Sequence, residues 1–216
     1  MERRQSLIFE APHKIAVEET AVVRPAAGQV LVKTMFSAIS PGTEMLFYRG
    51  QVPEAMPVDA TIDALAGEFS YPLAYGYALV GTVTAAGPQV DQAWLGQTVF
   101  VFAAHQSHVI SKVGELIPVP ADLPPQDAVL LPFMETAVSF LMDGQPLIGE
   151  QVVVFGQGVI GLLATRLLAE YPLASLVTVD PFPMRREYSL HLGANQALDP
   201  GAGGFEQQLA AAIQAD

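Results

Sequence analysis

The sequence predicts a mixed α/β chain, with a β-barrel or sandwich in its first half and a partial parallel sheet in its second. Up to about residue 111, short apolar and β-branched stretches are separated by Gly and Pro, which is typical of an irregular β-barrel or sandwich. From residue 124 onward, strand-length apolar runs alternate with helical patterns, as in parallel α/β sheets. The boundary is therefore expected between residues 120 and 150.

In the first half, four apolar stretches have the length and the bounding turn residues of strands. They lie within residues 28–40, 76–87, 96–104 and 108–113. Residues 55–72 interrupt this pattern, and we expect a short helix or a surface excursion there.

In the second half, residues 124–144 predict helices that are punctuated by Pro132 and stopped by Gly144. Beyond them the pattern predicts strands within 151–156, 175–180 and 196–200, and helices within 159–171, 184–193 and 205–215. The expected organisation is a first domain over residues 1–122, connecting helices over 123–149, and a sheet domain over 150–216.

The composition excludes several functional classes. A net charge of -12, with only 10 basic residues, argues against binding to nucleic acid or to an anionic membrane surface. With no Cys, the chain has no disulfide, no thiolate nucleophile and no Cys-ligated zinc. Glu10, Pro12 and His13 interrupt the N-terminal apolar run, so it fails as a signal peptide, and no run reaches the roughly 20 residues that span a bilayer. We expect a cytoplasmic protein.

A glycine pattern between an apolar strand and a helix predicts a dinucleotide site. The pattern, G-x-G-x-x-G, is formed by Gly156, Gln157, Gly158, Val159, Ile160 and Gly161. The first glycine suits a tight turn, the second lets the backbone approach a pyrophosphate, and the third lets helix and strand pack closely. Asp180 follows the next predicted strand, 19 residues after Gly161 and close to the spacing of about 20 that such sites show. Without this context, the pattern indicates only a tight strand-to-helix turn.

The residues around Asp180 bear on the choice of cofactor. A carboxylate there accepts hydrogen bonds from ribose hydroxyls and repels the additional phosphate of NADP, so NAD is favoured over NADP. Arg185 and Arg186 lie just beyond Asp180 and either compensate for its charge or simply form a solvated helix turn. Both interpretations stay open.

The order of these motifs resembles the medium-chain dehydrogenase/reductase superfamily, the alcohol and sorbitol dehydrogenase type. The similarity runs over residues 21–200 and is carried by residues 28–50, 71–90 and 96–102 in addition to the glycine loop. The resemblance implies a GroES-like domain followed by a partial Rossmann domain. The stretch "SAISPGTE" resembles a zinc-free branch that includes bacteriochlorophyllide dehydrogenase-like proteins.

The resemblance also indicates that zinc is absent. Where zinc-dependent members carry Cys and a His-Glu pair, this sequence has Ser40, Tyr77 and Ala78. Hydroxyl and phenol groups are poor ligands for zinc, and Glu135, which matches a carboxylate ligand of some relatives, does not hold a metal alone. We therefore expect no zinc.

Four side chains are candidates for acid–base chemistry in place of a metal. Glu135 lies in an otherwise apolar helical segment, where a buried carboxylate often marks a site, although a charge at a helix N-terminus explains it too. Tyr77 is either catalytic or a core aromatic. His105 and His108 lie near a strand edge, where an exposed loop histidine is the commoner outcome.

The family resemblance implies two further site residues, both threonines. Thr136 matches a small hydroxyl residue that packs near the nicotinamide. Thr43 matches a hydroxyl that relays protons in zinc enzymes, although a turn residue after Ser40–Gly42 explains it as well.

Two functions remain open at this point. The first is a zinc-independent, NAD(P)-dependent oxidoreductase that acts on the alcohol or carbonyl carbon of a small molecule. The second is a non-catalytic nucleotide-binding or assembly subunit. At most three strands follow residue 150, so we expect an open sheet edge that a homo-oligomer or a partner chain covers. A piece of a longer protein, or a natural split protein, explains the same feature.

Overall fold

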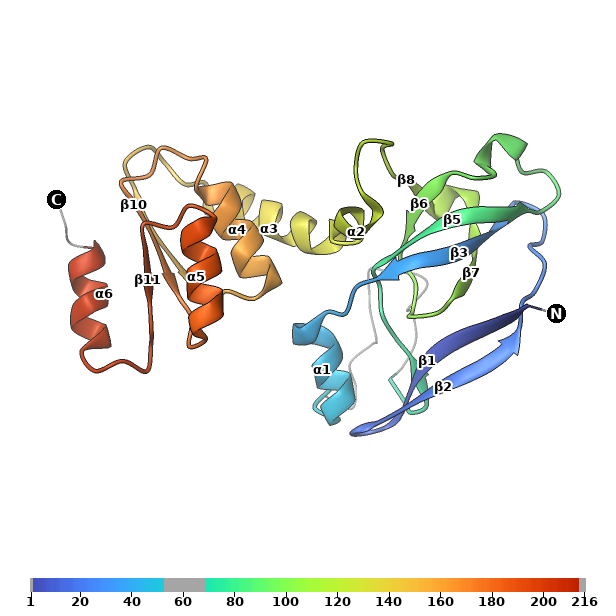
Figure 1. Cartoon of the computed structure of the whole chain (residues 1–216), viewed down its shortest axis with the longest axis horizontal. Coiled ribbons are helices and arrows are strands. Elements are labelled where there is room, and N and C mark those ends of the chain that lie inside the picture. The colour runs from blue at the N-terminus through green and yellow to red at the C-terminus, as the bar shows by residue number, and fades with distance from the viewer. Residues whose placement is uncertain (1, 53–68, 214–216) are drawn as a thin grey trace. The chain divides into compact units, whose positions relative to one another are not determined.

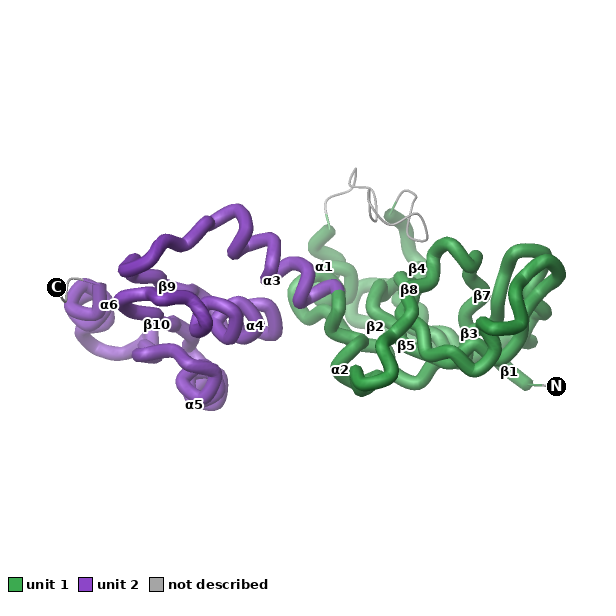
Figure 2. Tube along the Cα trace, turned by 90° about the horizontal axis from the view of Figure 1, so that it is seen from above, with its two compact units in different colours: residues 1–131 green, residues 132–216 purple. Residues whose placement is uncertain are grey.

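The structure is a computed structural model that describes residues 2–52 and 69–213 (Figure 1). The chain divides into two compact units, Met1–Leu131 and Pro132–Asp216 (Figure 2). The division lies within the range 123–149 that the sequence assigns to connecting helices.

The larger sheet of unit 1 is antiparallel, with strand order β7-β3-β5-β6-β8. Its strands are β3 (Gln29–Ser37), β5 (Leu79–Ala86), β6 (Thr98–Val101), β7 (His108–Lys112) and β8 (Ile117–Pro118). Alternate residues of β3 face the core: Val30 and Val32 are fully buried, and Val32 pairs with Val83 and Val109 on the neighbouring strands. The strands β3, β5, β6 and β7 confirm the four predicted stretches of the first half, whereas β8 was not predicted. A short 3-10 helix, η2 (Gln92–Trp94), lies between β5 and β6, and a second, η3 (Val113–Glu115), lies between β7 and β8. The helix α2 (Pro125–Ala128) follows β8.

A second sheet of unit 1 has the order β2-β1-β4 and was not predicted. It contains the hairpin β1 (Arg3–Ala11) and β2 (Lys14–Ala21), and the short strand β4 (Leu73–Ala74). The hairpin turns at His13, which has a positive φ of 61°. Most of β2 is exposed, so its sequence shows no buried face.

The helix α1 (Pro41–Arg49) was also missed. Pro41 occupies the first helical position, where its missing N–H costs nothing, and Gly50 closes the helix in the left-handed conformation at φ 66°. The helix brings Phe47 against Phe9 and Tyr75 in an aromatic core. Most of the expected excursion over residues 55–72 lies outside the described residues, which resume at residue 69.

Unit 2 is a three-layer α/β arrangement, as predicted. A parallel sheet with the order β11-β10-β9 is formed by β9 (Gln151–Phe155), β10 (Ser175–Val179) and β11 (Gln196–Leu198). Its helices are α3 (Leu131–Gly144), α4 (Val159–Leu168), α5 (Pro183–His191) and α6 (Phe205–Ile213). Pro132 lies in the first turn of α3, where a proline is tolerated, rather than between two helices.

Both faces of this sheet are covered, which explains the continuous apolar strands. Leu176 packs with residues of α3 and α4, such as Leu141 and Leu168, whereas Val177 and Val179 pack with α6. At 14 residues α3 is the longest described helix, and within the described part of the chain no helix combines the length and apolarity needed to cross a membrane.

Candidate functional site

The glycine loop of unit 2 has the geometry that its sequence predicts. The strand β9 ends at Phe155, Gly156 turns the chain at φ 85°, and α4 begins at Val159. A Cβ on Gly161 would lie 1.9 Å from the Gly156 carbonyl oxygen, so only glycine lets the helix approach the turn this closely. Gly156 N–H donates to Val179 O at 2.8 Å and fixes the turn to the next strand.

The space over this loop is open. A Cβ added to Gly156 or Gly158 would meet no atom within 4 Å, and no side chain caps α4 at Gly158. A helix N-terminus offers N–H donors and the positive end of the helix dipole to an anion. The loop therefore fits the diphosphate of a dinucleotide.

Asp180 lies at the loop, as its spacing predicts. It follows β10 directly and is 1% exposed. Its Oδ2 accepts Gln157 N–H at 2.7 Å and its Oδ1 accepts Phe182 N–H at 2.8 Å. Each carboxylate oxygen has a second acceptor site beyond these two bonds. The buried carboxylate also has a structural role that the sequence did not reveal, because it ties the loop to the following strand end.

The Gln157 side chain supports the loop from below. It is fully buried, its Nε2 donates to Gly156 O at 3.2 Å, and its Oε1 accepts the Thr165 hydroxyl at 3.0 Å. A buried polar side chain is stable only when its groups are paired, and Thr165 on the inner face of α4 supplies the partner. The sequence feature that could have revealed this pair is a glutamine between two glycines, followed eight positions later by a threonine within an apolar helix.

The two arginines beyond Asp180 have different environments. Arg186 donates to Asp180 O at 2.8 Å and pairs with Asp199 at 3.2 Å, so it holds the ends of two strands together. Arg185 is 43% exposed, lies 4.8 Å above the Phe182 ring and is 3.6 Å from Asp180 Oδ2. Arg185 is thus the more accessible cation beside the carboxylate.

The remaining candidates of unit 2 lie in helices. Val159 and Ile160 form the half-buried first turn of α4. The Thr136 hydroxyl donates to Pro132 O at 2.9 Å within α3, which explains it without a ligand. Glu135 is exposed, so the expectation of a buried carboxylate is wrong: its position on α3 leaves it outside the apolar stripe that contains Ala137 and Leu141.

Unit 1 contains a buried polar centre at His105. The imidazole is 9% exposed, its Nε2 lies 2.8 Å from Glu44 Oε2, and its Nδ1 is hydrogen bonded to Ser37 Oγ. Glu44 is 3% exposed, and its Oε1 accepts Ser40 N–H at 2.7 Å. The expectation of an exposed loop histidine is wrong, because the loop after β6 folds inward against α1 and the end of β3. Ser37 and Glu44 were missed, since they lie 68 and 61 residues from His105.

Gly76 shows how closely this centre is packed. Its φ is 125°, and a Cβ there would lie 2.8 Å from His105 Cδ2 and Nε2. The His105 backbone is held as well, because its N–H donates to Tyr75 O at 3.1 Å and its carbonyl accepts Leu7 N–H at 2.9 Å. The imidazole is therefore fixed from several elements.

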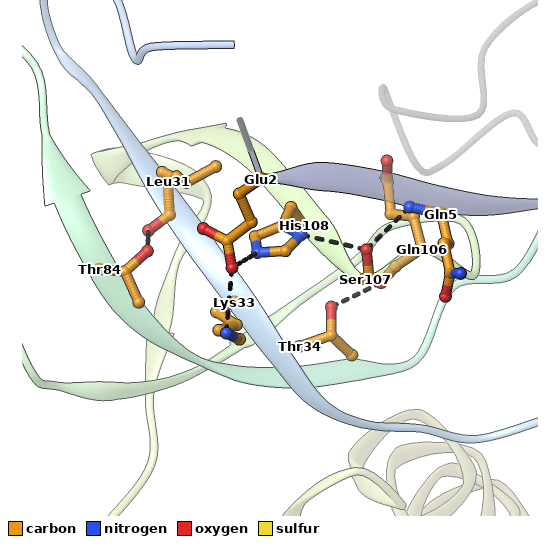
Figure 3. A network of polar contacts seen from close by, with 9 residues as sticks. All are labelled: Glu2, Gln5, Leu31, Lys33, Thr34, Thr84, Gln106, Ser107 and His108. Carbon is orange, nitrogen blue, oxygen red and sulfur yellow. Dashed lines mark hydrogen bonds and ion pairs between the residues drawn. The ribbon is translucent and has the colours of Figure 1, made fainter. Parts of the chain in front are cut away.

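His108 belongs to a second network, at the N-terminal end of β1 (Figure 3). It is buried too, and its Nδ1 lies 3.0 Å from Ser107 Oγ. Its Nε2 lies 3.3 Å from Glu2 Oε1, but the two atoms are not aligned for a hydrogen bond. Glu2 is 57% exposed, and the hydrogen bond and positive charge of Lys33 lower the pKa of its carboxyl.

Tyr77 follows Gly76 directly in the sequence, and Thr43 precedes Glu44. Tyr77 is half-buried and packs edge-on against Tyr75, with ring centroids 6.4 Å apart, at the border of the aromatic core. Thr43 is half-buried in the first turn of α1, rather than in a turn before a strand.

The positions that match zinc ligands in the resembling family do not fit a zinc ion. Ser40 is buried with its N–H on Glu44, Tyr77 offers a phenol, and Ala78 has no donor. Across residues 2–52 and 69–213, no three His, Cys, Asp or Glu side chains are grouped so that they could hold a metal ion.

Comparison with known proteins agrees with the fold. No protein-family profile matches the chain. The starvation-sensing protein RspB of Escherichia coli K12 is 25% identical over 226 residues, which cover 90% of this chain and 62% of RspB. The 2-desacetyl-2-hydroxyethyl bacteriochlorophyllide A dehydrogenase of Cereibacter sphaeroides is 33% identical over 86 residues, covering 40% of this chain and 24% of that enzyme. The chain thus spans about three fifths of RspB.

Solved structures share the fold of the chain. RspB of Escherichia coli CFT073, in complex with NADH, has a TM-score of 0.78 at 21% identity and covers 96% of this chain and 66% of its own. A dehydrogenase of Sinorhizobium meliloti 1021 bound to NADP has a TM-score of 0.74 at 18% identity, with 94% and 64% covered. The first unit is accordingly a GroES-like domain and the second is the Rossmann part. The homologues and structural neighbours of the chain are dehydrogenases of the medium-chain dehydrogenase/reductase superfamily, and the chain shares their fold.

Proposed function

We propose that the chain is a cytoplasmic, zinc-independent NAD(P)-dependent oxidoreductase that acts on the alcohol or carbonyl carbon of a small molecule. The observation that carries this proposal is the glycine loop of unit 2. It leaves open space over Gly156 and Gly158, and Asp180 is bonded to its Gln157 N–H at 2.7 Å. The solved relatives that contain NADH or NADP support a nicotinamide cofactor.

Each part of the loop has a task in this proposal. The N-terminus of α4 after Gly158 binds the diphosphate, and the free acceptor sites of Asp180 bind the ribose hydroxyls. NAD is favoured over NADP, because the Asp180 carboxylate at the loop repels the additional phosphate of NADP. The bound nicotinamide supplies the hydride chemistry.

Proton transfer then falls to side chains of unit 1. Ser40, Tyr77 and Ala78 lack the thiolate and imidazole ligands that zinc prefers, which supports a metal-free reaction. Among the predicted acid–base candidates we favour His105, because both of its ring nitrogens are hydrogen bonded to side chains.

A substitution at Gly158 tests the cofactor site without disturbing the fold. Gly158 has φ -73° and ψ -171°, which any residue adopts, and a side chain there meets no protein atom within 4 Å. We expect Gly158→Val to stay folded and to weaken NADH binding at least about tenfold, because the side chain fills the diphosphate space. Fluorescence titration with NADH and NADPH measures this, with Gly203→Ala as the control in a loop that is equally open. Failure of the wild-type chain to bind either nucleotide would overturn the proposal.

A second candidate function is a nucleotide-binding subunit that assembles with another chain. The strand β9 lies at an edge of the three-stranded sheet that the structure describes, and Phe155 at its end is 66% exposed. Leu147 and Ile148, just before β9, are exposed as well. A strand edge with apolar surroundings favours pairing with a second copy or a partner chain. Nucleotide binding without turnover of an alcohol and aldehyde panel, together with an oligomer in light scattering, would favour this function over the first.

A further inference from the structure

We propose that Ser37, His105 and Glu44 form a proton relay, in which the Ser37 hydroxyl takes the proton from a bound alcohol during oxidation and returns it to a carbonyl in reverse. The proposal rests on the oxidoreductase function for its substrate class. The relay itself is argued from unit 1 alone.

The hydrogen bonds define the direction of the relay. A carboxylate only accepts hydrogen bonds, and Glu44 Oε1 already accepts the Ser40 N–H. The His105 Nε2, 2.8 Å from Oε2, must then carry a proton. In a neutral imidazole the Nδ1 is left as an acceptor, so the Ser37 hydroxyl donates to it. A hydroxyl that donates to an imidazole, itself oriented by an acid, is a hydroxyl activated by a general base.

Burial gives the relay one accessible end. Glu44 and His105 are buried, whereas Ser37 is half-buried at the end of β3. The imidazole packs directly against Gly76, where a Cβ would lie 2.8 Å from the ring. A ligand therefore meets the relay at the hydroxyl, while the acid that orients the imidazole is shielded from water.

The network at His108 provides an internal contrast with the same three residue types. There the carboxylate of Glu2 is the exposed end, and its contact with Nε2 is not aligned for a hydrogen bond. The Ser107 Oγ accepts Gln5 N–H at 2.9 Å and so helps to fix β1 (Figure 3). Ser107 is thus a structural hydroxyl beside a histidine, and it serves as the matched control for Ser37.

The proton balance closes through solvent. When an alcohol is oxidised, its O–H proton passes to Ser37 Oγ while the Ser37 proton passes to His105 Nδ1, and the hydride is taken up by the nicotinamide of the proposed cofactor. His105 is then an imidazolium paired with Glu44, and after the product leaves it returns its proton through the Ser37 hydroxyl to solvent. Reduction of a carbonyl runs through the same transfers in the opposite direction.

Nitrogen NMR of the full chain labelled at histidine tests the proton positions without any substrate or cofactor. At about pH 7.5 we expect the His105 ring to carry one proton, on the Nε2 that faces Glu44. Ser37→Ala should keep this tautomer, and Glu44→Gln should move the proton to Nδ1, because an amide donates where the carboxylate accepted. A proton on Nδ1 in the wild type, or an imidazolium, would overturn the relay.

A small sulfonyl fluoride tests whether the hydroxyl is both activated and accessible. In this reaction the Ser37 Oγ–sulfur bond forms, fluoride leaves, and the hydroxyl proton goes to His105 and then to solvent. Using phenylmethylsulfonyl fluoride and peptide mass spectrometry, we expect Ser37 to react at least about tenfold faster than Ser107, and Glu44→Gln to remove most of this difference. Equal rates at the two serines contradict the proposal. Neither readout needs a dinucleotide, so a failed relay is distinguishable from a failed cofactor assignment.

Discussion

Glu44 in unit 1 and Asp180 in unit 2 are the two acidic residues that are buried in the part of the chain described by the structure. Both accept a short hydrogen bond from a backbone N–H, 2.7 Å from Ser40 to Glu44 and 2.7 Å from Gln157 to Asp180. Their second partners differ. Asp180 accepts another backbone N–H, from Phe182, whereas Glu44 faces the imidazole of His105.

Because of this difference, Asp180 has a structural role, whereas Glu44 contacts a group that can gain and lose a proton. A backbone N–H can only donate, so the partners of Asp180 fix its acceptor role and with it the shape of the glycine loop. An imidazole exchanges donor and acceptor roles between its nitrogens, so the partner of Glu44 can change its protonation. Unit 2 therefore uses its buried acid to hold a binding loop, while unit 1 uses its own to control a proton.

The largest expected effect comes from breaking the anchor of unit 2 at Gly161. In Gly161→Ala the new methyl group would lie 1.9 Å from the Gly156 carbonyl oxygen, so the turn must move and Gln157 N–H must leave Asp180. We expect a loss of about 3 kcal/mol in the free energy of unfolding of unit 2, and NADH binding weakened more than about tenfold.

Two optical signals separate the units in this experiment. The chain has 1 tryptophan, Trp94, which lies in unit 1, whereas the long helices α3–α6 give unit 2 most of the far-ultraviolet circular dichroism. Denaturant titrations should show a shift in circular dichroism with Trp94 fluorescence little changed. Gly203→Ala is the control, since a side chain there meets nothing within 4 Å. Equal stability of the two variants would show that the close approach at Gly161 is not required.

A smaller effect is expected from Asp180→Asn. An asparagine has one carbonyl oxygen and one NH₂ group, so whichever way it turns, either Gln157 N–H or Phe182 N–H faces a donor instead of an acceptor. A buried donor left without a partner costs about 1–3 kcal/mol, and we expect about 2 kcal/mol here, measured by circular dichroism. Glu187→Gln removes an exposed charge from α5 nearby and should change little. A neutral result for Asp180→Asn would mean that the loop does not depend on both bonds.

The elements of unit 2 could be predicted from the sequence more fully than those of unit 1. Its strands are buried on both faces and its helices are amphipathic, so each element is evident from its own residues. The loop and Asp180 are joined by 23 residues of a single strand–helix–strand unit, which makes their contact predictable from spacing alone. The buried role of Gln157 was missed because the motif treats its position as variable.

Unit 1 is harder to predict from the sequence, because its contacts depend on antiparallel pairing between residues that are far apart in the chain. The strand β3 pairs with β7 from Gln29↔Lys112 to Lys33↔His108, and this register, together with α1, brings Ser37 and Glu44 to His105. No local sequence pattern indicates that these three side chains lie close together. The helix α1 was missed since Ser40–Gly42 has the composition of a turn, although the same proline also starts helices well.

The smallest expected effect on stability, and the sharpest test of the comparison, is Glu44→Gln. The glutamine carbonyl can face Ser40 N–H while its NH₂ group faces His105 Nε2, provided that the imidazole moves its proton to Nδ1 and donates to Ser37. Every polar group then keeps a partner, so we expect less than about 1 kcal/mol, well below the cost of Asp180→Asn. Denaturation followed by Trp94 fluorescence measures this, with Glu18→Gln as an exposed control on β2. If Glu44→Gln costs as much as Asp180→Asn, the imidazole does not change its tautomer, and the two buried acids are both anchors.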